Sequence, residues 1–302
     1  MPSEPQLLIV GSGALATLFA ARLSLAGVNV ALIGGWEAAL EAIAQFGARL
    51  RTPSGTRAGA VRVYRYPREV RGIPLALVLV KAWQTARAAT LLAECLPANG
   101  LALTLQNGMG NREILVESLG AARVAVGATT YGATLFAPGE VIPGGEGTVS
   151  LSDHPQIGAA VALLGAGNFR VQVHPQIESV LWGKLVINAA INPITALLNQ
   201  PNGALLHNLA GQRLMEQAAA EAAQVAAAEG VPLPYPSPIA AAEDVVRRTA
   251  ENISSMLQDI RRGAPTEIEA INGYITRRAA AHAVPCPVNS SLYQLVRAVV
   301  QV

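Results

Sequence analysis

The sequence has 302 residues, enough for two domains of ordinary size. Hydrophobic residues make up 51% of the chain and charged residues only 14%, so a large core is possible and bulk disorder is excluded. The formal net charge is +2, with no run of Lys or Arg, which argues against a nucleic-acid partner. The two cysteines, Cys95 and Cys286, are too few for a disulfide framework or a metal site, and we expect both to be buried thiols.

The beginning of the chain has none of the features of a secretory signal. Its first apolar run, Leu7–Val10, is short, and Glu4 precedes it. Elsewhere we find no apolar segment that approaches the roughly 18–20 uncharged residues needed to cross a membrane. We therefore expect a cytoplasmic protein that has no membrane partner.

A glycine-rich turn joins the first predicted strand to the first predicted helix. The strand is expected over Gln6–Val10, the helix over Thr17–Ala26, and a second strand over Asn29–Ile33. The turn has the pattern Gly-x-Gly-x-x-Ala, whose small residues permit a tight turn, a close approach of backbone to a pyrophosphate, and close helix–strand packing. This context favours dinucleotide binding over a purely structural turn. The residues concerned are Gly11, Ser12, Gly13, Ala14, Leu15 and Ala16.

The end of the second strand bears on the choice of cofactor. An Asp or Glu there would bind the ribose 2′-hydroxyl of NAD, but the sequence continues Gly34-Gly35-Trp36, with no acid until Glu37. The missing carboxylate favours NADP over NAD, although no Arg stands at this point either. Trp36 could cover the adenine ring or be an ordinary core or surface residue.

Two polar residues follow further buried strands. The strand predicted over Leu75–Val80 ends at Lys81, and the one over Leu101–Leu105 leads to Asn107. Ligands of open parallel sheets bind at the carboxyl ends of strands, so both residues are candidate contacts to cofactor or substrate. The alternatives are a solvated lysine and a turn-forming Asn-Gly pair. The other elements expected in this half are a strand meander over Gly47–Tyr64, a helix over Ala82–Leu96, a strand over Arg123–Thr130, an antiparallel hairpin over Glu140–Leu151, a helix over Pro155–Gly165 and a strand over Phe169–Val173.

A polar stripe interrupts the apolar helix predicted over Trp182–Leu198. Lys184, Asn188 and Asn192 recur at spacings of four and therefore lie almost above one another on one face. Buried polar groups cost free energy unless they are hydrogen-bonded, so we interpret the stripe as the wall of a wet cleft. The alternative is a snorkelling lysine with two amides bonded to neighbouring backbone. Pro193 predicts a kink at this point.

The chain beyond Pro175 is predicted to be all helical. We place a domain boundary there, between residues 1–175 and 176–302. The long Ala-rich helix of this half can pack inside the domain or against a second subunit, so the protein is a monomer or a homodimer. The elements expected are a loop over Asn199–Gly203 with Asn202, the Ala-rich helix Ala210–Glu229, a Pro-rich connector over Gly230–Pro238, a helix over Ile239–Glu251, a bent or ligand-binding segment over Asn252–Asp259, a helix that starts at Pro265–Glu269 with Thr266 as a possible cap, and a last helix over Ser290–Val302.

Several longer motifs give the chain a resemblance to a known family. They are the glycine-rich turn at Gly11, Lys81-Ala82-Trp83-Gln84, Gln106-Asn107-Gly108-Met109-Gly110, WGKLVINAAINPITAL from Trp182, NISSMLQDI from Asn252 and TEIEAINGYI from Thr266. Over nearly its whole length the chain resembles the ketopantoate reductase (2-dehydropantoate 2-reductase) family. The resemblance implies an α/β Rossmann-type dinucleotide-binding domain followed by an all-α domain, with the active site in the cleft between them.

The resemblance also implies a reaction and a set of site residues. The reaction is the NADPH-dependent reduction of 2-dehydropantoate to (R)-pantoate in pantothenate biosynthesis, with NADP(H) as cofactor and a small 2-oxo acid as substrate. Lys184 would be the general acid, with the pKa of ~10.4 of an ordinary lysine, and Glu267 would orient substrate and lysine. The other implied positions are Asn188, Asn192, Asn202, Asn252 and Ser255 for substrate, Lys81 and Asn107 near the nicotinamide and ribose, and Ala133 for a backbone contact to the cofactor.

One position departs from the family's pattern. Many members carry an Arg for the 2′-phosphate where this sequence has Gly34-Gly35. Two other functions stay open at this stage. One is a sister reductase that has the same scaffold and acts on another branched 2-oxo acid. The other is a nucleotide-binding paralogue without catalytic turnover.

Overall fold

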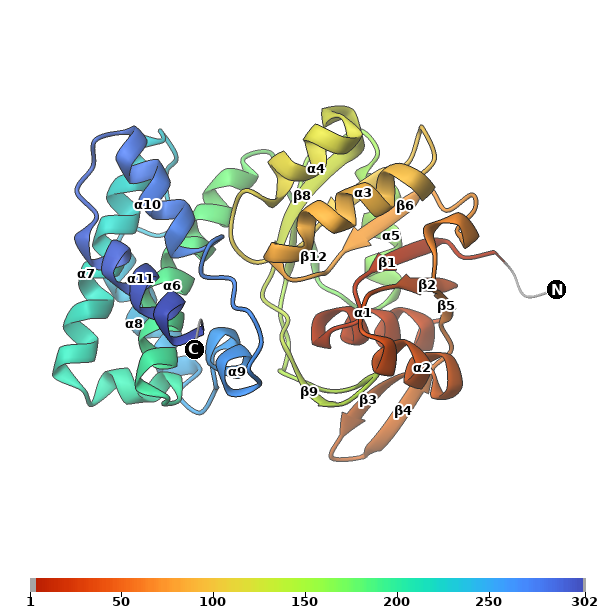
Figure 1. Cartoon of the computed structure of the whole chain (residues 1–302), viewed down its shortest axis with the longest axis horizontal. Helices are drawn as coiled ribbons and strands as arrows, with labels where there is room; N and C mark the ends of the chain where they lie inside the picture. The colour runs from red at the N-terminus through yellow and green to blue at the C-terminus, as the bar shows by residue number, and fades with distance from the viewer. Residues whose placement is uncertain (1–3, 301–302) are drawn as a thin grey trace. The chain divides into compact units, whose positions relative to one another are not determined.

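The computed structural model describes residues 4–300, and the chain divides into two compact units (Figure 1). Unit 1 comprises Met1–Gln106 and Asn111–Ile177, and unit 2 comprises Asn107–Gly110 and Glu178–Val302. The short segment 107–110 thus lies in the N-terminal half of the sequence and yet packs with unit 2. Unit 1 is an α/β fold and unit 2 is helical, which confirms the predicted fold class.

Unit 1 is built around an eight-stranded sheet with the strand order β12-β11-β8-β7-β6-β1-β2-β5. Neighbouring strands are parallel, except that β11 runs antiparallel to β8. The central strands are continuous apolar runs because both faces of the sheet are covered. The strands are β1 (Leu7–Val10), β2 (Val30–Ile33), β5 (Arg62–Tyr64), β6 (Leu75–Val78), β7 (Leu101–Thr104), β8 (Val124–Thr129), β11 (Val149–Ser152) and β12 (Val171–His174).

Alternate residues of the central strand β1 pack against different helices. Ile9 shares a core cluster with Phe19 of α1, whereas Val10 shares one with Leu92 of α3. This division follows from the two-residue repeat of a strand. Figure 1 shows α3 and α4 side by side over the second of these faces. The helices of unit 1 are α1 (Ala14–Leu25), α2 (Glu37–Phe46), α3 (Thr85–Cys95), α4 (Asn111–Leu119) and α5 (Ile157–Ala166), with the 3-10 turns η1 (Pro67–Glu69), η2 (Ala82–Gln84) and η3 (Ala121–Arg123).

The strand order reverses at β1. The chain adds β2 and β5 on one side of β1 and then β6, β7 and β8 on the other. In open α/β sheets the ligand binds at such a switch point, outside the carboxyl ends of the strands. Here the last residues of β1 and β6, Val10 and Val78, are partners in register. Gly11 begins the glycine-rich turn directly after Val10.

A second sheet of four strands overturns one prediction from the sequence. The antiparallel hairpin expected over Glu140–Leu151 does not form, because β10 and β11 belong to different sheets. The hairpin partner of β10 is β9, which was not predicted, and the two strands turn at Gly139, whose φ is +67°. The strands of this small sheet are β3 (Ala48–Thr52), β4 (Gly55–Gly59), β9 (Ala133–Ala137) and β10 (Glu140–Pro143), in the order β4-β3-β10-β9.

Unit 2 is a set of helices around one apolar core. The Ala-rich helix α7 buries its small side chains, among them Ala218, Ala222 and Ala226, and packs against α8, α10 and α11. Its alanine face is therefore part of the core of unit 2. The elements are α6 (Ile177–Leu198), η4 (Asn202–Leu206), α7 (Leu209–Ala228), α8 (Pro238–Arg248), α9 (Ser255–Arg261), α10 (Asn272–Ala281) and α11 (Pro287–Val300).

Two helix starts differ from the predicted ones. Pro265–Glu269 lies outside the helices, and α10 begins only at Asn272. The Thr266 hydroxyl, predicted as a possible helix cap, instead accepts the N–H of Ile268 at 3.4 Å. The last helix begins at Pro287, three residues before the predicted Ser290. Its start is held by Glu221 of α7, whose carboxylate accepts the N–H groups of Val288 and Asn289, each at 2.9 Å.

Helix α6 meets the length and composition test for a membrane span, which the sequence reading did not anticipate. Its most apolar 18-residue window has a mean hydropathy of 1.3, and 67% of that window is buried. Predominant burial is typical of a core helix in a soluble protein, and Trp182 and Val186 on α6 belong to the apolar core of unit 2. The helix continues past Pro193 to Leu198.

Both cysteines are free, buried thiols, as predicted. Burial raises the pKa of Cys95 to about 11 and the pKa of Cys286 to about 12, and the nearby Glu221 carboxylate adds to the second shift. Neither residue is a thiolate at neutral pH, so neither has the reactivity of a nucleophilic cysteine.

Candidate functional site

In the glycine-rich turn of unit 1, an added side chain would meet neighbouring backbone at one glycine and empty space at another. Gly11 has a φ of +137°, and a Cβ on it would lie 3.0 Å from the carbonyl group of Leu79. Gly13 caps α1 with an extended backbone and no side-chain cap, and a Cβ there would meet nothing within 4 Å. Ala16 is fully buried where α1 packs on the sheet. The turn therefore leaves the first N–H groups of α1 open to an anion.

Ser12 ties this turn to the end of β2. Its hydroxyl accepts the backbone N–H of Trp36 at 3.3 Å, and a Cβ on Gly34 would lie 2.5 Å from that oxygen. Position 34 therefore has no room for a side chain. Trp36 precedes α2 and is 37% exposed, so it is not a core residue. Ala14 and Leu15 are half-buried in the first turn of α1.

A buried glutamine connects the carboxyl ends of β6 and β7. The side-chain amide of Gln106 donates to the carbonyl of Val80 at 3.0 Å and to the Thr85 hydroxyl at 2.8 Å, while its oxygen accepts from Thr104 at 2.9 Å. Lys81, which follows Val80, donates its backbone N–H to Gln84 at 3.2 Å and is half-buried. Lys81, one of the two predicted strand-end positions, thus belongs to an ordered edge of the sheet.

Ala133 lies in the small sheet. It is the first residue of β9, pairs with Pro143 of β10, and is half-buried. Because β9 was not expected, no local pattern placed Ala133 in a strand.

The polar stripe on α6 is graded in its exposure. Lys184 and Asn188 are half-buried, whereas Asn192, one turn further on, is only 9% exposed. Residues on the remaining faces, such as Val186 and Ala189, are fully buried in the core of unit 2. The stripe is therefore the polar edge of an otherwise buried helix, as its spacing predicted.

Hydrogen bonds connect Lys184 to two polar side chains from distant parts of the sequence, those of Asn107 and Glu267. Its ammonium donates to the side-chain oxygen of Asn107 at 2.8 Å, and the amide nitrogen of Asn107 donates to the carboxylate of Glu267 at 3.1 Å. Burial lowers the pKa of Lys184 to about 8, and the negative charge of Glu267 works in the opposite direction. Lys184 is therefore not the ordinary lysine with a pKa of ~10.4 that was expected.

Backbone contacts hold Asn107 and Glu267 together. The N–H of Met109 donates to the carbonyl of Ala270 at 2.8 Å, and Gly108 has a φ of +76°. A Cβ on Gly108 would lie 2.5 Å from the Cβ and the carbonyl oxygen of Ala270. The Asn-Gly pair is therefore more than a turn former. Only glycine at position 108 lets this segment come so close to the segment that carries the buried Glu267.

The remaining predicted substrate residues gather around the start of α9. The backbone N–H of Asn202 donates to the carbonyl of Asn252 at 3.0 Å, so these two are adjacent. Asn202 is buried and its amide donates to Thr249 at 2.9 Å, whereas its side-chain oxygen has no hydrogen-bond partner among residues 4–300. Asn252 is exposed, and Ser255 is the half-buried first residue of α9.

The sequence reading missed the link between this segment and α6. The Thr195 hydroxyl is hydrogen-bonded to the Ser254 hydroxyl at 2.9 Å, and Ser254 accepts the N–H of Leu257 as the cap of α9. Thr195 is fully buried, and it lies three residues after Asn192. That spacing, one turn further along the polar stripe, was the available signal.

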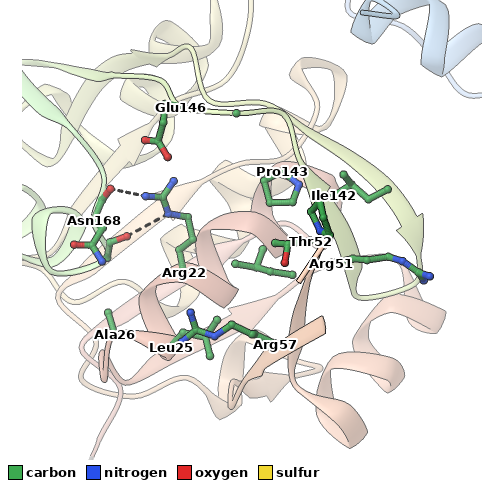
Figure 2. Close-up of a pocket in the computed structure, with 14 residues that line it drawn as sticks. Arg22, Leu25, Ala26, Arg51, Thr52, Arg57, Ile142, Pro143, Glu146 and Asn168 are labelled. Atoms are coloured by element: carbon green, nitrogen blue, oxygen red, sulfur yellow. Dashed lines mark hydrogen bonds between the residues drawn. The ribbon is translucent and has the colours of Figure 1, made fainter. Parts of the chain in front are cut away.

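A cavity of about 440 Å³ lies elsewhere in unit 1, at the C-terminal end of α1 and the small sheet (Figure 2). Arg22 points into it and donates to the backbone oxygens of Gly167, at 3.3 Å, and Asn168. Its guanidinium also lies over the ring of Phe169. The predicted site residues all belong to the described part of the chain, and none of them lines this cavity. Arg22, the first residue of α1 to line the cavity, follows Gly13 of the glycine-rich turn by nine residues, about 14 Å of helix.

Comparison with known proteins covers nearly the whole chain. Residues 7–156 match the model of the family described as ketopantoate reductase PanE/ApbA, and residues 176–300 match that of its C-terminal part. The chain is 36% identical to the 2-dehydropantoate 2-reductase of Halobacterium salinarum, over 97% of this chain and 98% of that one.

Solved structures of similar proteins have the same fold. One is a PanE/ApbA family ketopantoate reductase from Ralstonia eutropha JMP134, with a TM-score of 0.91, 30% identity and 98% coverage of both chains. Another is D-mandelate dehydrogenase with NADH and anilino(oxo)acetate, with a TM-score of 0.90, 25% identity and 98% coverage of both chains. With both family models matched and the full-length relatives above 30% identity, the chain belongs to the ketopantoate reductase family.

Proposed function

We propose that this protein reduces 2-dehydropantoate to (R)-pantoate with NADPH, as its curated relatives' name describes. Residues 1–175 would bind the nucleotide, and residues 176–302 would bind the 2-oxo acid. The observation that carries the proposal is the series of hydrogen bonds from Lys184 through Asn107 to Glu267, in a chain that belongs to the ketopantoate reductase family.

The glycine-rich turn fits a dinucleotide. Gly13 leaves open space before the uncapped first turn of α1, which also contains no acidic residue, so a pyrophosphate would meet N–H groups and the positive end of the helix. The end of β2 has no carboxylate to repel a 2′-phosphate, which supports NADP. When bound, the reduced nicotinamide supplies the hydride. The residues proposed to hold the nucleotide are Gly11, Ser12, Gly13, Ala14, Leu15, Ala16, Lys81, Asn107 and Ala133.

Lys184 is proposed as the general acid. Reduction of the C2 carbonyl places negative charge on its oxygen, which a nearby ammonium stabilises and then protonates. With a pKa of about 8, Lys184 is mostly protonated at neutral pH and gives up its proton more readily than an ordinary lysine. The chain has only two lysines, Lys81 and Lys184, against 20 arginines, and both are proposed site residues. Arginine does not lose its proton in proteins, so it could not take over this step.

Asn107 and Glu267 are proposed to position the ammonium. An ammonium has three N–H groups, and the 2.8 Å bond to Asn107 fixes the direction of the other two. The Glu267 carboxylate accepts from Asn107 and so holds the amide with its oxygen toward Lys184. Its charge also keeps the pKa of Lys184 from falling further. Together they hold a donor ready before the substrate charge develops.

The amides on α6 and near α9 are proposed to bind the substrate. A 2-oxo acid with a hydroxyl and a carboxylate needs both donors and acceptors, and an amide supplies each. Asn188 and Asn192 share the α6 stripe with Lys184, and the side-chain oxygen of buried Asn202 has no hydrogen-bond partner within residues 4–300. Asn252 and Ser255 complete the proposed set.

A steady-state assay with purified protein tests the proposal. Loss of reduced-nicotinamide absorbance is followed with 2-dehydropantoate and either NADPH or NADH. We expect turnover with a higher kcat/KM for NADPH. Failure to turn over 2-dehydropantoate with either nucleotide would contradict the proposal.

A second candidate is a sister reductase for another branched 2-oxo acid. The likeness to D-mandelate dehydrogenase, whose solved structure holds NADH and anilino(oxo)acetate, favours it. A panel of aliphatic and aryl 2-oxo acids in the same assay decides between them. A kcat/KM for an aryl 2-oxo acid above that for 2-dehydropantoate would support the second candidate.

We further propose a cytoplasmic enzyme without nucleic-acid or membrane partners, present as a monomer or a homodimer. The balanced charge and the predominantly buried α6 support the first part. The burial of the alanine face of α7 within unit 2 removes one surface for a second subunit. Light scattering coupled to size-exclusion chromatography measures the oligomeric state.

A further inference from the structure

An arginine from α3 lies against the glycine pair at the end of β2. A Cβ on Gly35 would be 3.5 Å from Nη1 of Arg87, 3.8 Å from its Cζ and 3.9 Å from its Nη2. Arg87 is the third residue of α3, which follows β6, so it is 52 residues away from Gly35 in sequence. The guanidinium therefore lies at ordinary van der Waals distance from the Cβ position of residue 35.

The charge of Arg87 is not balanced by the protein around it. Its side chain is exposed, and within residues 4–300 it makes no hydrogen bond or ion pair. The acid that follows β2 most closely, Glu37, forms an ion pair with Arg65, which directly follows β5. The negative charge nearest to this strand end in sequence is therefore already paired with a cation other than Arg87.

The geometry of the strand end directs a ligand toward Arg87. Ser12 fills the space that a side chain at position 34 would need. The next residue, Gly35, is exposed to solvent. In dinucleotide-binding sheets the ribose 2′-position lies at the end of the second strand, where an acid selects NAD and an arginine accommodates NADP. Here the strand end itself carries neither group.

We infer that Arg87 binds the 2′-phosphate of NADP, as a cation supplied by α3 in place of one on the strand end. This inference rests on the proposed nucleotide-binding function of unit 1. A guanidinium matches a phosphate by paired N–H groups, and both terminal nitrogens of Arg87 lie within 4 Å of the Gly35 Cβ position. Two glycines at the strand end leave room for the phosphate beside it.

The test measures binding of nucleotide fragments and needs no turnover. Adenosine 2′,5′-bisphosphate and 5′-AMP are titrated into the full-length protein by calorimetry. They differ only in the 2′-phosphate, so the ratio of their affinities isolates that group. We expect Arg87→Ala to lower the affinity for the bisphosphate about 10- to 100-fold, and to change that for 5′-AMP less than about twofold.

Arg170 provides the matched control. It is an exposed arginine just before β12, at the opposite edge of the eight-stranded sheet. Arg170→Ala should leave both affinities unchanged. Arg87→Lys should retain part of the preference, because the charge stays and the paired donors are lost. Since Arg87 is exposed, its substitution should leave the thermal midpoint unchanged.

The pH dependence of the preference for the bisphosphate provides a second measurement, which should not change if Arg87 has only a structural role. A phosphate monoester gains its second charge with a pKa near ~6, so the wild-type preference for the bisphosphate should grow between pH 5 and pH 7. In Arg87→Ala this growth should be much smaller. High salt should reduce the wild-type preference as well.

The outcomes separate this inference from the proposed function. If Arg87→Ala changes the affinities for both fragments equally, or changes neither, the inference is wrong while nucleotide binding stands. If the wild-type protein binds neither fragment, the proposed function itself fails. If the wild type prefers 5′-AMP, the assignment of a 2′-phosphate site fails.

Discussion

The glycine-rich turn of unit 1 and the Lys184 cluster of unit 2 are built in opposite ways. The turn depends on missing side chains: Gly11 avoids the Leu79 carbonyl, and Gly13 leaves backbone N–H groups uncovered. The cluster depends on side chains that are present, because Lys184 bonds to Asn107, which in turn bonds to Glu267. The turn is continuous in sequence, whereas the cluster joins residues 77 and 160 positions apart.

This difference decides how each region should respond to substitution. A backbone site fails when atoms are added to it, and it is insensitive to charge and pH. A side-chain site fails when atoms are removed, and its activity follows the protonation of its members. Nucleotide affinity and turnover should therefore be separable by single substitutions in the two regions.

The largest expected effect is the loss of the proton donor in the cluster. Lys184→Ala should lower kcat about 10²- to 10⁴-fold and leave the affinity for NADPH unchanged. Lys184→Arg keeps a positive charge but cannot release a proton, so it should recover little of the loss. Stopped-flow turnover and fluorescence titration of NADPH measure the two quantities. Full activity in Lys184→Arg would show that charge alone is required.

The glycine-rich turn offers the opposite experiment. Gly13→Ala adds a methyl group in open space and should keep the stability of the fold, while weakening NADPH binding about tenfold because the methyl obstructs the phosphate. Gly11→Ala forces a side chain into a positive φ and against Leu79, and should destabilise the fold by about 1–3 kcal/mol. Thermal unfolding and calorimetric titration check the pair. Equal losses of stability in both variants would contradict the distinction.

The pH dependence of turnover should identify the Lys184 proton. As the proposed general acid, Lys184 acts in its protonated form, so kcat/KM should be level below the pKa of about 8 and fall about tenfold per pH unit above it. Glu267 raises this pKa, so Glu267→Gln should move the break to lower pH. Asn107→Asp adds a negative charge beside the ammonium and should move it to higher pH. A break that stays fixed in both variants would mean that another group titrates.

The comparison also explains what could be predicted from the sequence. The turn, β1 and α1 follow from a local pattern, because Gly11 and Gly13 act through backbone within one short segment. The α6 stripe follows from helical spacing alone. The proximity of Asn107 to Glu267 could be expected only through the family resemblance, since no spacing connects them. The reach of Arg87 to Gly35 was not expected, because it depends on how α3 lies across the strand ends.

The strand and helix errors also arise from contacts between residues that are far apart in sequence. The sequence pattern predicted a hairpin of β10 and β11, since both are short strands near glycines. Their separation into two sheets depends on partner strands elsewhere in the chain. The start of α11 depends on Glu221, a residue of another helix. The pKa of Lys184 also could not be read from the sequence, because burial sets it.

The smallest expected effect concerns the tie between α6 and the start of α9. Thr195→Val removes the hydroxyl bonded to Ser254 and keeps the shape of the side chain, so it should lower stability by about 1 kcal/mol. If Asn252 and Ser255 bind substrate, the KM for the 2-oxo acid should rise severalfold while kcat changes little. Thr276→Val on α10 loses a similar bond to a carbonyl of its own helix and should leave KM unchanged. An equal rise of KM in both variants would show that lower stability, and not the α6–α9 tie, affects substrate binding.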